Sequence, residues 1–224
     1  MTTDFSSLLS HRGRLGHPWS TVTPPPPGTI SFGGGIPDPS TLPLAALAHA
    51  AERVLAEEGI EALQYGGSLG DVYLREELAA RYGLRYGVPL SPDQVMITTG
   101  SSQALDALCA ALLDPGDVVL TEEPTFTGSL WTFRAHGARL LPMPLDRGGL
   151  DVDALEERLG ALRREGVQPK LIYTTPDFQN PTATCLAAER RQRLVELAAE
   201  HGCLVMEDTA YEEVRIDAAP LPTL

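Results

Sequence analysis

The sequence predicts an α/β protein of three layers, in which a mainly parallel sheet is covered by helices on both faces. From Pro92 onward, short apolar runs typical of strands alternate with segments of helical spacing. Parallel neighbours in a sheet need such helical crossovers. The 224 residues are 43% hydrophobic, which is enough to bury one large core or a core with a small appendage.

The chain before Pro92 has a different character. Residues 1–42 are rich in Pro, Gly, Ser and Thr, which predicts an arm that lies over a surface and has no core of its own. Residues 43–90 form a helical segment that leads into the main domain. Within it, the apolar spacing predicts helices over residues 44–58 and 71–82.

Residues 91–224 carry the regular alternation and form the ligand-binding domain. Each expected strand is a short apolar run, and each expected helix has apolar residues three and four positions apart. The expected elements are strand 94–98, helix 101–113, strand 118–121, helix 127–136, strand 139–142, helix 152–164, strand 170–174, helix 187–201 and strand 203–207.

Charge and cysteine content argue against several classes of protein. The formal net charge of −13 disfavours binding to nucleic acid or to an anionic membrane. Three widely spaced cysteines without a Cys-x-x-Cys pair predict neither a disulfide framework nor a metal site. The sequence has no run long and apolar enough for a membrane span and no secretory leader, so we expect a cytoplasmic enzyme.

Ligands of parallel α/β sheets bind beyond the carboxyl ends of the strands, and the first polar turn expected there runs from Thr98 to Ala104. Gly100 permits close approach of the backbone, and the hydroxyls of Ser101 and Ser102 lie where a helix start favours an anion. A phosphate would fit. The alternative is that a serine only caps the helix.

Three further strand exits carry groups suited to a flat, protonated heteroaromatic ring. Phe126 could stack on such a ring or belong to the core. Asn180 offers a donor and an acceptor on a backbone stiffened by Pro181. Asp208 and Tyr211 follow the last strand, and a half-buried Asp208 would need a cationic partner unless it only caps a turn.

Taken together, these features resemble the class I/II aminotransferases, the pyridoxal-phosphate enzymes built like aspartate aminotransferase. Within this family the sequence is most similar to the 2-aminoadipate and kynurenine type and to the aminotransferase-like part of MocR-type regulators. The resemblance runs from about residue 30 to residue 224 and rests on six motifs: Gly33-Gly34-Gly35-Ile36-Pro37-Asp38-Pro39, Leu63-Gln64-Tyr65-Gly66, Thr99-Gly100-Ser101-Ser102-Gln103, Glu123-Pro124-Thr125-Phe126, Phe178-Gln179-Asn180-Pro181-Thr182 and Glu207-Asp208-Thr209-Ala210-Tyr211.

The resemblance implies pyridoxal 5'-phosphate as cofactor, an amino acid and a 2-oxo acid as substrates, and a homodimer in the complete protein. It implies that Asp208 pairs with the protonated ring nitrogen and that Asn180 and Tyr211 bond the phenolic oxygen of the ring. The remaining implied contacts are Ser101, Ser102 and Gln103 at the phosphate, Phe126 stacked on the ring, Tyr65 at the phosphate of the neighbouring subunit's cofactor, and Gly34 and Gly35 along the substrate site.

The sequence departs from the family pattern in three places. Ala183 stands where the family usually has glycine, and Thr209 where it commonly has a second aspartate. The only lysine, Lys170, opens a strand at the end opposite the cofactor, so it cannot be the lysine that holds the cofactor covalently. That lysine, the carboxylate-binding arginine, the C-terminal part of the large domain and the small domain are expected beyond residue 224.

Two other functions stay open at this point. One is a non-catalytic regulatory module that binds the cofactor or an amino acid, which the missing lysine favours. The other is a different pyridoxal-phosphate chemistry on the same fold, such as a carbon–sulfur lyase or a decarboxylase.

Overall fold

The computed structural model describes residues 5–15, 26–30, 34–35, 37–216, 219 and 221–224. Parts of the expected arm, namely residues 1–4, 16–25, 31–33 and 36, therefore lie outside the described residues. The chain divides into two compact units, one of residues 1–20 and 98–224 and the other of residues 21–97. No helix among the described residues is long and apolar enough to cross a membrane.

A five-stranded sheet forms the centre of the first unit, in the order β3-β2-β1-β4-β5. The pairs β1–β2, β1–β4 and β4–β5 are parallel, and only β2–β3 is antiparallel. The strands are β1 Val118–Glu123, β2 Arg139–Asp146, β3 Gly149–Leu150, β4 Pro169–Thr174 and β5 Leu204–Glu207.

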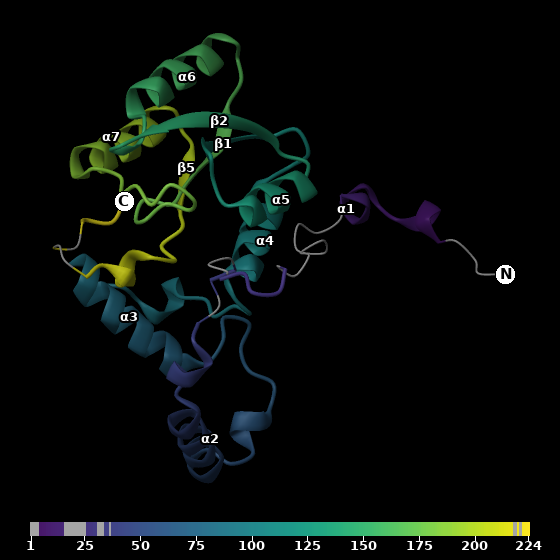
Figure 1. Cartoon of the computed structure of the whole chain (residues 1–224), viewed down its shortest axis with the longest axis vertical. Coiled ribbons are helices and arrows are strands. Elements are labelled where there is room, and N and C mark those ends of the chain that lie inside the picture. The colour runs from purple at the N-terminus through teal and green to yellow at the C-terminus, as the bar shows by residue number, and fades with distance from the viewer. Residues whose placement is uncertain (1–4, 16–25, 31–33, 36, 217–218, 220) are drawn as a thin grey trace. The chain divides into compact units, whose positions relative to one another are not determined.

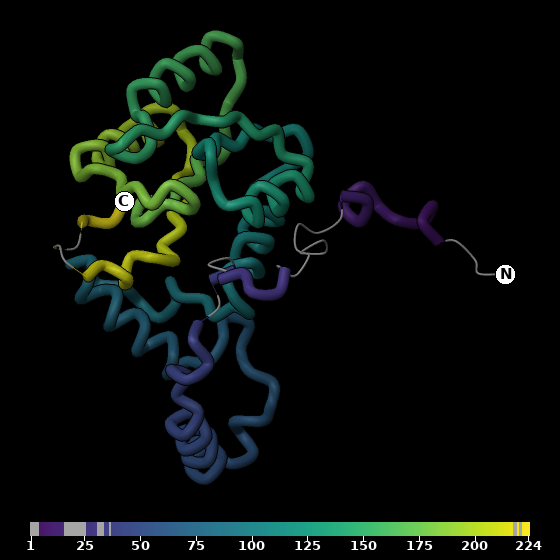
Figure 2. Tube along the Cα trace, in the orientation of Figure 1, coloured from purple at the N-terminus to yellow at the C-terminus, as the bar shows by residue number. Residues whose placement is uncertain are grey.

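Helices join these strands and end close to the residues expected from the sequence. Figure 2 follows the alternation of strand and helix from the teal residues near position 100 to the yellow C-terminus. The helix over residues 152–164 begins after Asp151, whose side chain accepts a hydrogen bond from the backbone N–H of Ala154 at 3.0 Å. The helices of this unit are α1 His11–Arg14, α4 Ser101–Leu112, α5 Thr127–Ala135, α6 Val152–Arg164 and α7 Ala188–Glu200.

The helices cover both faces of the sheet because successive side chains of each buried strand point to opposite sides. Val118 and Leu120 of β1 pack with leucines of α6 and α7. Val119, between them in sequence, packs on the other face with Cys109 of α4 and Phe133 of α5. Figure 1 shows α4 and α5 on one side of β1 and α6 and α7 on the other. The predicted three-layer α/β fold is confirmed.

Two expectations about strands were wrong. Residues 94–98 form no strand, because Pro92–Gln94 is a turn of 3₁₀ helix and Ile97 makes its backbone bond to the loop residue Leu69 at 2.9 Å. An apolar run becomes a strand only where a second strand supplies a ladder of hydrogen bonds. Conversely, β2 runs four residues past the expected end, through Pro142 and Pro144. β3 pairs with it only at Leu145 and Asp146, so these prolines, which have no N–H, interrupt no bond on that side.

The second unit contains α2 (Leu44–Glu57) and α3 (Val72–Tyr86). Asp71 caps α3 by accepting from the backbone N–H of Leu74 at 2.8 Å. Gly87 ends the helix in the left-handed conformation with φ of 69°. The two helices predicted for residues 43–90 are both present.

Candidate cofactor site

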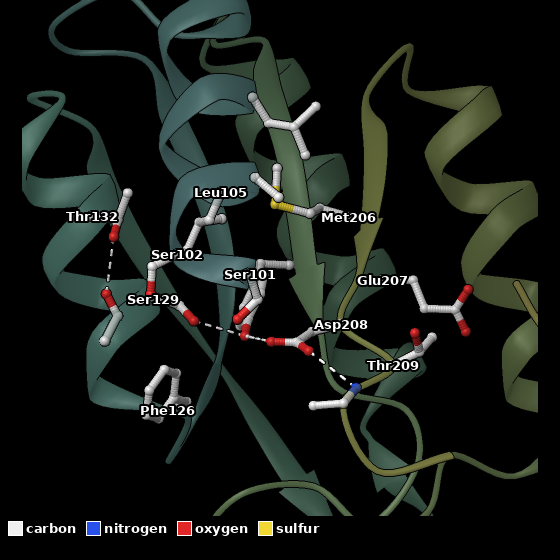
Figure 3. Close-up of a pocket in the computed structure, with 15 residues that line it drawn as sticks. Ser101, Ser102, Leu105, Phe126, Ser129, Thr132, Met206, Glu207, Asp208 and Thr209 are labelled. Atoms are coloured by element: carbon white, nitrogen blue, oxygen red, sulfur yellow. Dashed lines mark hydrogen bonds between the residues drawn. The ribbon is translucent and has the colours of Figure 1, made fainter. Parts of the chain in front are cut away.

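A cavity of about 330 Å³ opens at the carboxyl end of β4 and β5, within the first unit. Its polar wall comes from the starts of α4 and α5 and from the segment after β5, and its apolar wall includes Leu105 and Met206 (Figure 3). The lining includes four of the predicted site residues, Ser101, Ser102, Phe126 and Asp208. Residues that follow β1 and β5 thus meet in one hollow with the start of α4.

The start of α4 forms one side of this cavity. Gly100 precedes the helix with φ of 78°, and no side chain caps the helix start. The reading of a serine as a simple cap is therefore wrong. Ser101 and Ser102 are exposed at the cavity, at the positive end of the helix dipole, where an anion is stabilised. The Gln103 side chain instead accepts from the backbone N–H of Thr99 and is not part of the cavity wall.

Phe126 lies at the start of α5, half-buried, with its ring against the wall of the cavity (Figure 3). The ring packs directly on Gly128, since a Cβ added at Gly128 would come within 2.5 Å of the ring. A glycine two residues after the aromatic therefore lets the ring lie flat at this place. The sequence analysis missed this role of Gly128.

Asp208 follows β5 and is half-buried at the cavity. Its Oδ2 accepts from the phenol of Tyr173 at 2.7 Å, and its Oδ1 accepts from the backbone N–H of Ala210 at 3.3 Å. No ion pair among the described residues includes Asp208. The predicted cationic partner is thus not supplied by this part of the chain, and the carboxylate faces a cavity that could receive one.

Tyr173 lines the cavity and was missed by the sequence analysis. It is 2% exposed in β4, and the Ser129 hydroxyl donates to its phenol oxygen at 2.7 Å. Burial raises the pKa of Tyr173, and the nearby Asp208 charge raises it further. The available signal was strand alternation, which turns Tyr173 to the same face as Leu171, toward α4 and α5.

Asn180 and Tyr211 lie beside each other, because the Asn180 amide donates to the Tyr211 hydroxyl at 3.4 Å. Their bonds to the phenolic oxygen of the ring stay a prediction. A buried carboxylate stabilises the loop before Asn180 by hydrogen bonds. Glu122 of β1 accepts from Gln179 Nε2 at 3.1 Å and from the backbone N–H of Thr175 at 3.2 Å. Burial raises the pKa of Glu122, although these donors act in the opposite direction.

A buried ion-pair group fixes the middle of the same loop, at Asp177. Asp177 Oδ2 lies 3.0 Å from Arg191 Nη2, and Asp177 Oδ1 lies 2.6 Å from Arg215 Nη2. The Arg215 guanidinium also lies over the ring of Phe178, 4.9 Å from its centroid. Two arginines from distant segments therefore fix the chain just before Asn180.

The departure at Ala183 has a structural consequence. Ala183 has φ of 58°, a left-handed conformation that is strained for any residue with a side chain and relaxed for glycine. This is the physical reason for a glycine at the equivalent position. The strain in this chain lies three residues after Asn180.

Lys170 does not line the cavity, and the three other predicted contacts belong to the second unit. Lys170 stands at the start of β4 and pairs with Asp117 at 3.7 Å, at the end of the strand away from Asp208. Gly34, Gly35 and Tyr65 belong to the second unit, where both glycines have positive φ and Tyr65 is exposed. Their roles toward substrate and phosphate stay predictions. The described residues contain no cluster of three or more metal-ligating side chains.

The model of the family described as "Aminotransferase class I and II" matches residues 29–221. The chain belongs to this family. The 2-aminoadipate transaminase of Thermus thermophilus is 42% identical over 88% of this chain and 47% of its own length. The kynurenine aminotransferase of Pyrococcus horikoshii, solved in complex with PMP, superposes with a TM-score of 0.80 at 39% identity over 85% of this chain and 47% of that one. The probable rhizopine catabolism regulatory protein MocR of Rhizobium meliloti is 29% identical over 88% of this chain and 38% of its own length.

The chain spans about half the length of the curated relatives it matches. Pyridoxal phosphate is the cofactor that such a family implies, and the donor set of the cavity fits it. A helix start with two hydroxyls suits a phosphate, an aromatic ring suits a flat heterocycle, and an anionic carboxylate without a cation suits a protonated ring nitrogen.

Proposed function

We propose that this chain is the part of a pyridoxal-phosphate-dependent aminotransferase that binds the phosphate and the ring of the cofactor. The observation that carries the proposal is Asp208, a carboxylate at the wall of a ring-sized cavity, held by a phenol and a backbone N–H and paired with no cation among the described residues. Membership of the aminotransferase family supports the same reading.

Three parts of the cavity wall would each have a defined role. The start of α4, with Ser101 and Ser102, would bind the phosphate and fix the position of the ring. Phe126 would cover one face of the ring and exclude water from it. Asp208 would hold a proton on the ring nitrogen by a charge-assisted hydrogen bond.

When bound, pyridoxal phosphate supplies an electron sink for the carbon that loses a proton during amino transfer. An anionic Asp208 keeps the nitrogen of that ring cationic, which is the charge state that accepts electrons. Asn180 and Tyr211 would donate hydrogen bonds to the phenolic oxygen of the ring. Lys170 takes no part, because it stands at the start of β4, away from the cavity. We further propose a homodimeric, cytoplasmic protein that acts on an amino acid and a 2-oxo acid.

Titration of the chain with pyridoxal phosphate tests the cofactor part of the proposal. The background variant Lys170→Arg removes the only lysine and so prevents adventitious imine formation at that side chain. We expect saturable binding, followed by the quenching of tryptophan fluorescence or by cofactor absorbance, with competition by inorganic phosphate. Asp208→Asn should weaken binding by about 10- to 150-fold, since a hydrogen bond between charged groups contributes about 1.5–3 kcal/mol.

Absence of saturable binding, or equal affinity of the Asp208→Asn variant, would overturn the assignment of the cavity. The second candidate is a regulatory module that binds the cofactor without transferring amino groups, which the distant position of Lys170 and the likeness to MocR favour. Mass spectrometry of amino acid and 2-oxo acid mixtures incubated with the whole protein distinguishes the two. Amino transfer supports the enzyme, and cofactor binding without transfer supports the module.

A further inference from the structure

A row of three hydrogen-bonded side chains, Ser129, Tyr173 and Asp208, forms part of the cavity wall. Ser129 on α5 is 1% exposed, Tyr173 on β4 is 2% exposed, and Asp208 follows β5. The two bonds that join them are both 2.7 Å long. In Figure 3 the side chains of Ser129 and Asp208 point toward each other, and dashed lines run between them; these two bonds share the phenol oxygen of Tyr173.

The direction of both hydrogen bonds is fixed by chemistry. Burial raises the pKa of Tyr173, so its phenol stays protonated. An ionised carboxylate can only accept, so the phenol donates to Asp208. The phenol proton is already used in the bond to Asp208, so the phenol oxygen can only accept from Ser129. The Ser129 hydroxyl is therefore the donor of that hydrogen bond. The row therefore ends in a donor aimed at one oxygen of Asp208.

The phenol cannot easily move away from this place. The ring of Tyr173 packs edge-on against Phe133, with centroids 5.4 Å apart, and Phe133 is fully buried. Both rings belong to the core cluster between the sheet and helices α4 and α5. Close packing on all sides makes the hydroxyl a fixed point against which the more exposed carboxylate is oriented.

The two oxygens of Asp208 are consequently different. Oδ2 is held by the phenol at 2.7 Å, whereas Oδ1 has only the longer bond of 3.3 Å from the Ala210 backbone. A ring nitrogen in the cavity would meet the carboxylate through the oxygen that is less firmly held. We propose that Tyr173, supported by Ser129, is a positioning residue that orients Asp208 toward the cofactor's ring nitrogen.

This inference rests on the proposed function, and its test uses a pair of ligands that differ at one atom. Pyridoxal phosphate has the ring nitrogen, and its 1-deaza analogue has a C–H group in its place. Tyr173→Phe removes only the hydroxyl and keeps the buried ring. We expect this variant, in the Lys170→Arg background, to bind pyridoxal phosphate about tenfold more weakly, which corresponds to about 1.4 kcal/mol. Its affinity for the deaza analogue should stay within about twofold of the unsubstituted chain, because no hydrogen bond to Asp208 is made there.

Three controls separate positioning from a loss of structure. Tyr82→Phe, in the other unit, is the matched substitution and should change neither affinity. In the Asp208→Asn background, Tyr173→Phe should cause no further loss for pyridoxal phosphate, as a double-mutant cycle requires of coupled residues. The NMR shift of a ¹⁵N-labelled ring nitrogen should move toward that of the unprotonated ring in Tyr173→Phe and stay unchanged in Tyr82→Phe.

The outcomes are distinct. Equal weakening of both ligands by Tyr173→Phe would make Tyr173 a merely structural residue and overturn the inference, as would unchanged affinity for both. Failure of the unsubstituted chain to bind either ligand would overturn the proposed function together with this inference. Selective loss of pyridoxal phosphate binding, with the shift of the nitrogen signal, supports it.

Discussion

Arg191 should be one of the most costly side chains to remove, although it touches no part of the cavity wall. It is 2% exposed on α7, and its guanidinium lies 3.0 Å from Asp177 Oδ2. It also donates to the backbone carbonyls of Leu186 at 3.0 Å, Pro176 at 3.0 Å and Pro222 at 2.8 Å. Arg191→Met keeps much of the apolar stem and removes all of these bonds.

The expected cost follows from what the substitution leaves behind. Removal of one partner of a buried ion pair typically costs about 3–5 kcal/mol, because the other charge stays buried without compensation. Arg215 still lies 2.6 Å from Asp177 Oδ1, which places the ion-pair part at the low end of that range. The three backbone carbonyls also lose their hydrogen-bond donor, which destabilises the folded chain further. The free energy of unfolding should therefore fall by about 3–5 kcal/mol.

Arg190→Met is the matched control, one residue earlier on the same helix. Arg190 pairs with Asp146 at 2.7 Å, but the Asp146 side chain is 49% exposed. An exposed pair contributes about 0–1 kcal/mol. Arg190 also donates to the backbone carbonyl of Leu150 at 3.0 Å, and a hydrogen bond of this kind adds about 1 kcal/mol, so this variant should lose about 1–2 kcal/mol. Urea unfolding followed by circular dichroism measures both, and a shift in Tm of about 2–4 °C per kcal/mol is expected for a chain of this size. Equal stability of Arg191→Met and Arg190→Met would refute the view that the Asp177 group fixes the loop before Asn180.

Two further substitutions test buried features elsewhere. Burial raises the pKa of Glu122 in the folded chain. Between about pH 4.3 and this raised pKa, the folded chain keeps a proton that the unfolded chain has lost. The free energy of unfolding should therefore fall as pH rises through this range. Glu122→Gln should flatten this slope in urea unfolding at a series of pH values, whereas the exposed Glu157→Gln should not. Gly149 has φ of 87°, and an added Cβ would lie 2.8 Å from the Leu186 backbone, so Gly149→Ala should cost about 2–5 kcal/mol from strain and overlap together. Gly166→Ala, with φ of 70° and open space around it, carries only the strain of about 1 kcal/mol, and thermal unfolding that ranks the two variants equally would contradict the overlap.

Much of the fold could be predicted from the sequence because it depends on local patterns. The helix over 152–164 was predicted to the residue, since Asp151 supplies the cap and leucines recur on one face. The parallel sheet followed from the alternation of strands and helices. Because parallel strands share one carboxyl end, the order of strands and turns along the chain was enough to predict Phe126 and Asp208 at one edge. Ser101 reaches the same cavity from the start of α4, although the strand expected before it does not form.

The expected strand over 94–98 shows where this reasoning stops. Apolar content is a property of the segment, but a strand exists only through its neighbour. Ile97 makes its backbone bond to Leu69 in a loop, and residues 92–94 turn under the cap of Ser91. The antiparallel β3 is the converse, two residues that became a strand because Asp146 and Leu145 lie beside them.

The sequence by itself predicted the chemical types at the site, because a carboxylate, an amide and a phenol follow expected strands and two serines begin a helix. The cofactor class was predicted from the resemblance of these motifs to a family. Only the tertiary structure decided which groups orient these side chains. Tyr173 and Asp208 are 35 positions apart and Ser129 and Tyr173 are 44 apart, yet each pair is joined at 2.7 Å. Such bonds depend on how strands pair and how helices pack on them, and these are relations between distant segments that no local pattern contains.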